Sequence, residues 1–175
     1  MLELRQETPE DHVIVEALVK AAFADEVFSD QSEHHLVRRL RSTPSFIPEL
    51  SIVAELDDEI VGHILLSGIV IRNDNGVFPS LAMAPVSVLP AYQHQGIGGR
   101  LVRYAHQVAA DLGHGSVVLL GHADYYPRFG YEPAAKYHIS LPFEVPAENC
   151  MIIELIEGSL QGVSGMVEYP SVFFE

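Results

Sequence analysis

The stretch SVLPAYQHQGIGGRLVRYAH, from Ser87 to His106, decides the fold because it places three glycines directly before an amphipathic run. Gly96, Gly98 and Gly99 lie where a helix begins, although each glycine costs about 1 kcal/mol against alanine inside a helix. Free N–H groups and the positive end of the helix dipole make such a start an anion site, and glycines let a phosphate approach the backbone. A plain tight turn is the alternative. The apolar residues that follow at helical spacing are Ile97, Leu101, Val102, Ala105, Val108, Ala109 and Leu112.

Several common motifs do not fit this chain. A dinucleotide fingerprint needs a third glycine at position 101, where the chain has Leu101. A P-loop needs Lys and then Ser or Thr, whereas Arg100 and Leu101 follow Gly99. The segment GVSGM is not the Gly-x-Ser-x-Gly elbow of a serine hydrolase. The nine histidines are scattered without ligand spacing, so no metal site is predicted.

The strand before the glycines contains a proline. The segment SLAMAPVSVLP, from Ser80 to Pro90, leads into the turn and the helix and therefore reads as a central strand. Pro85 removes a donor from its hydrogen-bond ladder. We expect a bulge at Ala84–Pro85 that bends the strand and leaves main-chain groups free for a ligand, with an edge strand as the alternative.

The remaining pattern predicts an α/β fold. Helices are expected from Thr8 to Phe23, with Thr8 as the N-cap, and from Gln31 to Arg41. Because strands occur both in hairpins and around a helix, we expect one domain over residues 1–175. Its sheet is mixed and mostly antiparallel, with a bulged central strand and flanking helices. The expected strands are Met1–Arg5, Ser51–Leu56, Glu59–Ile71, Val77–Leu89, Val117–Leu120, Tyr137–Leu141, Met151–Ile156 and Gly165–Tyr169.

The composition limits the partners. Asp and Glu total 24 against 10 Lys and Arg, so the formal net charge is −14. This charge argues against nucleic acid and favours a cationic substrate, although an acidic surface can also serve solubility alone. Cys150 is the single cysteine, so an internal disulfide cannot form. The segment MLELRQETPEDH lacks the features of a signal peptide, and no run approaches about 20 apolar residues. We expect a cytoplasmic protein with no membrane contact.

Three segments together resemble the GNAT superfamily of acetyl-CoA-dependent N-acetyltransferases. Its Val-x-Pro and Gln-x-x-Gly-x-Gly pattern is present as Val88-Leu89-Pro90 and Gln93-x-x-Gly96-x-Gly98. VAELDDEIVGHI resembles the second and third strands of the family with their hairpin, and VVLLGHADYYPRFGYEPA its fifth strand, short helix and sixth strand. The latter segment, with GVSGMVEYPSVF, is similar to a bacterial branch of predicted acetyltransferases, the YhbS type. That branch commonly has Gly-Asp where this chain has Gly121-His122.

The resemblance implies a binding site for acetyl-CoA as cosubstrate, without a metal. Within it, the backbone of Val86, Ser87 and Val88 would hydrogen-bond the pantetheine arm. The pyrophosphate would lie against the loop from the motif's Gln93 through His94, Gln95, Gly96, Ile97, Gly98 and Gly99, with Arg100 beside it.

The resemblance also implies the chemistry. Tyr126 matches the tyrosine that protonates the leaving sulfur, with Tyr125 as the rival donor. Glu33 is a candidate base on the second helix, where a solvated helix face is the alternative. The acceptor would be a primary amine of a small molecule or peptide. A catalytically silent acyl-CoA-binding sensor or regulatory module is the alternative function, and a homodimer is left open.

Overall fold

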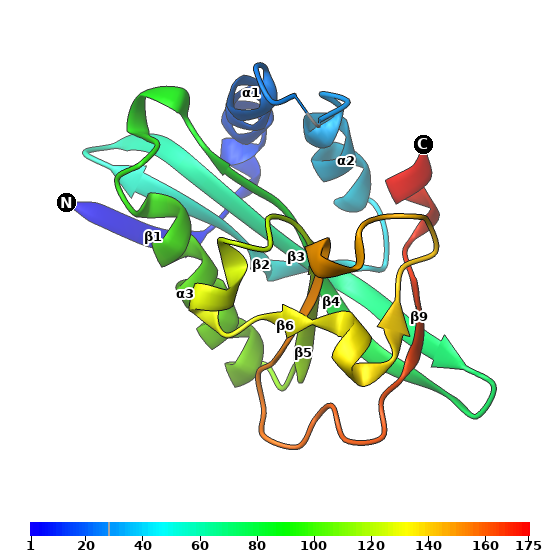
Figure 1. Cartoon of the computed structure of the whole chain (residues 1–175). Helices are drawn as coiled ribbons and strands as arrows, with labels where there is room; N and C mark the ends of the chain where they lie inside the picture. Colours follow the sequence, from blue (N-terminus) through cyan, green and yellow to red (C-terminus); the bar gives the residue numbers. More distant parts are fainter. Residues whose placement is uncertain (28) are drawn as a thin grey trace. The chain divides into compact units, whose positions relative to one another are not determined.

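The computed structural model describes residues 1–27 and 29–175, which form two compact units. The first unit comprises Met1–Ser67 and Ala84–Val108, and the second comprises Gly68–Met83 and Ala109–Glu175. The predicted single domain over residues 1–175 stays a prediction. The predicted α/β class is confirmed, with helices beside a mixed, mostly antiparallel sheet (Figure 1).

The first unit holds three antiparallel strands and three α-helices. Strand β1 (Leu2–Gln6) pairs with β2 (Phe46–Leu56), which pairs with β3 (Glu59–Asn73). The helices are α1 (His12–Phe23), α2 (Glu33–Leu40) and α3 (Ile97–Asp111), of which α1 and α2 lie side by side in Figure 1.

Helix α3 packs directly on the backbone of β3. A Cβ atom at Gly62 would lie 3.0 Å from Leu101 Cδ1 and 3.3 Å from Ile97 Cγ2. The helix therefore contacts the strand at a residue without a side chain, and this contact fixes where α3 begins. Both Leu101 and Ile97 are buried, as the apolar spacing predicts.

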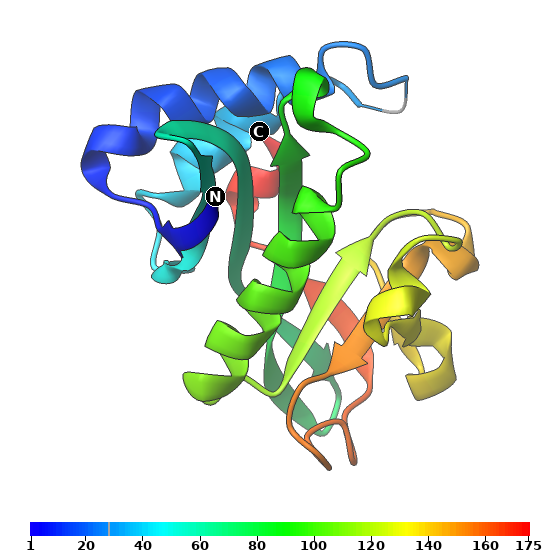
Figure 2. The ribbon, with the colours of Figure 1, turned by 90° about the vertical axis from the view of Figure 1, so that its left-hand side faces the viewer.

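The second unit is built on the far halves of β3 and β4 (Gly76–Val88). Strand β5 (Ser116–Leu120) runs parallel to β4 and antiparallel to β8 (Cys150–Glu154), its neighbour in Figure 2. Three short strands complete the unit: β6 (Glu132–Pro133) pairs with β8, and β9 (Gly165–Glu168) pairs with β3 and with β7 (Ile139–Ser140).

Several expected boundaries are wrong. Strand β2 begins at Phe46 rather than Ser51, and the expected strand Tyr137–Leu141 shrinks to β7. The reason for the second error is a 3₁₀ turn over Ala134–Tyr137, closed by His138 with a left-handed φ of 57°. The edge-strand alternative for β4 is also wrong, since β4 lies between β3 and β5. Its Ala84–Pro85 peptide bond is cis, and the bulge at this position stays a prediction.

One buried histidine lies in the middle of the first unit. His63 on β3 is fully buried, and its Nε2 lies 2.9 Å from Ser51 Oγ. Burial lowers the pKa of His63 to about 4; nearby Glu7 opposes this shift, and Arg41 adds to it.

In the part of the chain that the structure describes, no helix is long and apolar enough to cross a membrane.

The buried His63 makes stability depend on pH. Because its pKa is about 4 when folded and about 6.5 when unfolded, the unfolded chain binds the proton more tightly between these values. Folding stability is therefore lost as the pH falls through this window, by about 2 kcal/mol from His63 between pH 7 and pH 5. We expect His63→Asn to remove that part of the pH dependence, measured by urea unfolding at both pH values.

The matched control is His138→Asn, at an exposed left-handed position that tolerates asparagine. It should keep the pH dependence of the wild type. An unchanged pH dependence in His63→Asn would contradict the assignment.

Candidate functional site

The start of α3 carries unpaired main-chain donors. The Arg100 N–H donates to the Gly96 carbonyl at 3.1 Å, which is the first hydrogen bond of the helix. The N–H groups of Ile97, Gly98 and Gly99 therefore precede the helical ladder and have no acceptor within it. The first turn carries no acidic side chain. Three donors and the positive helix end are thus an arrangement suited to an anion, and the binding itself stays a prediction.

The loop before α3 leaves room in front of these donors. Gly96 has a left-handed φ of 82°, and a Cβ atom there would meet nothing within 4 Å. His94 is also left-handed, with φ 64°, so the chain turns twice within three residues. His94, Gln95 and Gly96 are all exposed. We call residues 94–99 the glycine loop.

The side chain of Gln93 faces the protein rather than the open space. Its Nε2 donates to the carbonyl of Val88, the last residue of β4, at 3.0 Å. Gln95 Nε2 lies 3.5 Å from the Ala91 carbonyl, and the Tyr92 hydroxyl donates to Glu59 at 2.9 Å. The motif glutamine therefore ties the loop to the strand end, and its contact with a ligand stays a prediction.

The expected binding strand turns one side chain inward. Ser87 is buried, and its Oγ has no hydrogen-bond partner among the described residues, whereas Val86 and Val88 are half-buried. The Leu89 N–H donates to the Val61 carbonyl at 2.9 Å and so joins the strand end to β3. Pantetheine binding by the Val86–Val88 backbone is not tested by this geometry.

Glu33 is the first residue of α2, and its carboxylate has a local partner. Ser29 Oγ lies 2.7 Å from Oε1 and 2.6 Å from Oε2, and it accepts the Gln31 N–H at 2.7 Å. Glu33 is half-buried rather than on a fully solvated face. This carboxylate closes the turn that leads into α2, and its role as base stays a prediction.

The second unit contains an aromatic cluster around Tyr126, which opens a 3₁₀ turn over Tyr126–Phe129. The Tyr126 ring lies edge-on to Tyr125 at 5.0 Å and to Tyr131 at 5.9 Å between centroids. Its Cε2 would lie 2.5 Å from a Cβ atom at Gly121, so the ring packs directly on the glycine.

The two candidate tyrosines differ in their surroundings. Burial raises the pKa of Tyr126 to about 12, with a smaller contribution from Tyr125, so this hydroxyl keeps its proton at neutral pH. Tyr125 instead has the Arg128 guanidinium 4.4 Å from its ring centroid. His122 is exposed, and its carbonyl accepts the N–H groups of both tyrosines. Only the main chain of His122 is thus engaged here.

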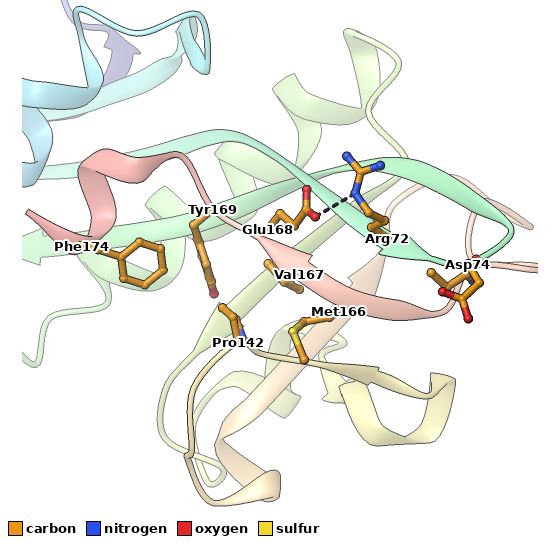
Figure 3. A pocket seen from close by; sticks show the side chains of 9 residues that line it. Arg72, Asp74, Pro142, Met166, Val167, Glu168, Tyr169 and Phe174 are labelled. Carbon is orange, nitrogen blue, oxygen red and sulfur yellow. Dashed lines mark hydrogen bonds and ion pairs between the residues drawn. The ribbon is translucent and has the colours of Figure 1, made fainter.

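A second concave surface in the second unit was not predicted from the sequence. A groove of about 560 Å³ lies along β9, with the Arg72–Glu168 ion pair (2.8 Å) at its side. Figure 3 shows the side chains that line it. None of the expected site residues lines it. The outward residues Met166 and Glu168, which alternate with buried Val167, are the sequence signal that could have found it. The lining residues are Arg72, Asn73, Asp74, Pro142, Met166, Val167, Glu168, Tyr169 and Phe174.

Comparison with known proteins identifies the family. Residues 48–133 match the family model of the acetyltransferase (GNAT) domain. The chain is 32% identical to the N-acetyltransferase YjhQ of Escherichia coli over 143 residues, covering 80% of this chain and 79% of YjhQ. The chain belongs to the GNAT family and is an N-acetyltransferase. No group of three His, Cys, Asp or Glu side chains suited to a metal occurs among residues 1–27 and 29–175.

Two solved structures are similar over nearly the whole chain. The crystal structure of E. coli YhbS in complex with CoA has a TM-score of 0.89 at 27% identity, covering 99% of this chain and 92% of YhbS. A GNAT acetyltransferase from Brucella melitensis in complex with acetyl-CoA has a TM-score of 0.80 at 30% identity, covering 99% and 98%.

The contact between Gly121 and Tyr126 can be tested by a double-mutant cycle. Gly121→Ala places a methyl group into the ring of Tyr126, and such overpacking costs about 1–3 kcal/mol. We expect this loss of unfolding free energy in the wild type and a much smaller loss in a Tyr126→Ala background, where the ring is absent. Urea unfolding of the four proteins measures both. An equal loss of unfolding free energy in both backgrounds would show that the ring of Tyr126 does not pack on Gly121.

Proposed function

We propose that this GNAT acetyltransferase moves the acetyl group of acetyl-CoA to a primary amine of a small molecule or peptide. The observation that carries the proposal is the start of α3, where the N–H groups of Ile97, Gly98 and Gly99 have no acceptor within the helix and a Cβ atom at Gly96 would meet nothing within 4 Å. They suit a pyrophosphate because anions bind at helix N-termini without lysine. The CoA in YhbS and the acetyl-CoA in the Brucella protein support this cosubstrate.

The end of β4, the glycine loop and Arg100 would each have a role in holding the cosubstrate. The glycine loop would cradle the pyrophosphate, and the Arg100 guanidinium beside it would offset its charge. Gln93 would keep the loop in place through the Val88 carbonyl. The main-chain N–H and C=O groups of Val86–Val88 would hydrogen-bond the pantetheine arm as a neighbouring strand would.

The transfer itself needs few groups from the protein. Acetyl-CoA supplies an acetyl thioester, whose carbonyl carbon is attacked by the lone pair of a neutral amine. A main-chain N–H near Val88 would stabilise the oxyanion. As the C–S bond breaks, the Tyr126 hydroxyl would give its proton to the sulfur. The ammonium form of the acceptor must lose one proton before the attack, and Glu33 or solvent would receive it. The proton that the nitrogen loses after the attack would replace, through solvent, the one that Tyr126 gives to the sulfur.

The acceptor is proposed to be cationic in its free form. The net charge of −14 concentrates cations near the protein, and a protonated primary amine is such a cation. The field acts over about 10 Å at 0.1 M salt, so it would favour encounter rather than select one amine. The side chains that line the acceptor pocket would determine which amine is bound.

Binding of the cosubstrate can be tested at Gly98. Gly98→Asp should place a carboxylate against the pyrophosphate, and we expect the Kd for acetyl-CoA to rise at least about tenfold in calorimetry because like charges repel at this helix end. Gly162→Asp is the matched control, since it adds the same charge at an exposed left-handed turn residue in open space. Equal affinity for all three proteins would refute the site. Thiol detection across a panel of primary amines then shows transfer as CoA release, whereas a binding-only module would release none.

The acid role of Tyr126 predicts a loss in turnover. Tyr126→Phe should lower kcat by about 100-fold or more, the range that loss of a general acid gives, with acetyl-CoA affinity within about twofold. Tyr125→Phe is the matched control in the same aromatic cluster. A loss in Tyr125→Phe with none in Tyr126→Phe would assign the acid to the neighbour instead.

A further inference from the structure

Residues from β2, α1, β3 and the end of α2 meet at the carboxylate of Glu7, whose side chain is only 2% exposed. Glu7 lies between β1 and the 3₁₀ turn Pro9–Asp11 that precedes α1. Ser51 of β2 donates to its Oε1 at 2.8 Å. His12 of α1 lies 3.7 Å from Oε1, and His63 of β3 lies 3.9 Å from Oε2. The residue at the end of α2 is Arg41.

Arg41 is the C-cap residue of α2 and donates two hydrogen bonds to the Glu7 carboxylate. Its Nη2 donates to Glu7 Oε2 at 2.7 Å, and its Nε donates to Oε1 at 3.3 Å. Its Nη1 reaches Glu16 of α1 at 3.5 Å, and Glu16 also pairs with Arg38 of α2. The Arg41 side chain is 9% exposed, so its bidentate contact with the Glu7 carboxylate is buried.

The protons of the cluster fix the orientation of Glu7. Ser51 donates its one hydroxyl proton to Glu7, so its oxygen must accept from His63 Nε2–H. His63 Nδ1 is then a bare lone pair, and it has no hydrogen-bond partner within the described chain. A charged imidazole would add a buried, unpaired N–H close to Arg41, which favours the neutral ring.

Such a cluster is suited to specifying position. Apolar contacts of α1 and α2 through Val15, Val37 and Leu40 are non-directional, so they hold the helices without fixing where each one sits. A buried ion pair adds little net stability over apolar packing, but its geometry permits one arrangement. Glu33 lies in the first turn of the helix that Arg41 ends.

We propose that Glu7 is a positioning residue for acetyl transfer. Through Arg41 it holds α2, and with it Glu33, in the place where an amine acceptor is bound, while Ser51 and His63 orient its carboxylate. The role in catalysis rests on the proposed function; the hold on α2 does not. Glu7 touches no substrate in this proposal.

Hydrogen exchange of the full chain tests the hold on α2. Glu7→Gln keeps the size of the side chain but removes the charge of the carboxylate that Arg41 contacts. Exchange of the amides at positions 37–41, at the end of α2 and its C-cap, should therefore speed up at least about tenfold. Exchange in α3 at positions 101–108 should stay within about twofold. Glu10→Gln, an exposed acid three residues away, is the matched control and should change neither. If Glu7→Gln does not fold, Ser51→Ala replaces it, because it removes one donor to the same carboxylate.

Kinetics separate positioning from mere stability. With the panel amine that gives the fastest CoA release, Glu7→Gln should raise the KM for the amine at least about fivefold and leave the Kd for acetyl-CoA unchanged. Equal exchange increases in α2 and α3, or none in either, would overturn the hold on α2, and an unchanged amine KM would overturn the catalytic role. If the wild type releases no CoA with any amine, the proposed function fails while the exchange data still decide the hold on α2.

Discussion

Three main-chain N–H groups at the start of α3 lack an acceptor within their own helix, and exposed residues of the glycine loop, His94, Gln95 and Gly96, directly precede them. Every helix has such donors, and most are satisfied by a capping side chain or by water. In this chain His94 and Gly96 both have a left-handed φ, and a Cβ atom at Gly96 would meet nothing within 4 Å. The contact of Gly62 with Ile97 and Leu101 in turn determines where the helix begins on β3. The placement of the proposed binding site thus depends on a few glycines.

Tyr126 and His63 show how burial shifts the pKa of a side chain in this molecule. The ring of Tyr126 packs on Gly121, and the resulting burial keeps its hydroxyl protonated at neutral pH. Burial also disfavours the positively charged form of His63, so this ring stays neutral beside Ser51 and Glu7. Desolvation disfavours phenolate and imidazolium alike. Both groups thereby hold one protonation state across the neutral range.

Sequence reasoning found the elements with strong periodicity. The face that begins with Ile97 identified α3, because this signal is local, and the glycines before it predict an anion site at its start. The 3₁₀ turn that ends at His138 was missed, since a left-handed residue other than glycine leaves no clear sequence mark. Pro85 argued for a bulge or an edge, and the tertiary fold placed it inside the sheet with a cis bond.

The Glu7 cluster was missed because its members are far apart in the sequence. Glu7, Arg41, Ser51 and His63 come from four separate segments, and only the folded chain brings them together. One signal was present: His63 interrupts the apolar run IVGHILL, where a polar side chain needs a buried partner. Periodicity reports which face is buried, and it does not report which distant polar groups meet there.

The most direct test of the account is the response of individual amide protons to CoA in nuclear magnetic resonance. Titration of the labelled protein with CoA follows every N–H group without any substitution. The account predicts that the amides of Ile97, Gly98 and Gly99 shift downfield as they begin to donate to phosphate oxygens, while those of Val167 and Glu168 in the β9 groove stay in place. Shifts confined to the groove, with the start of α3 unchanged, would contradict it.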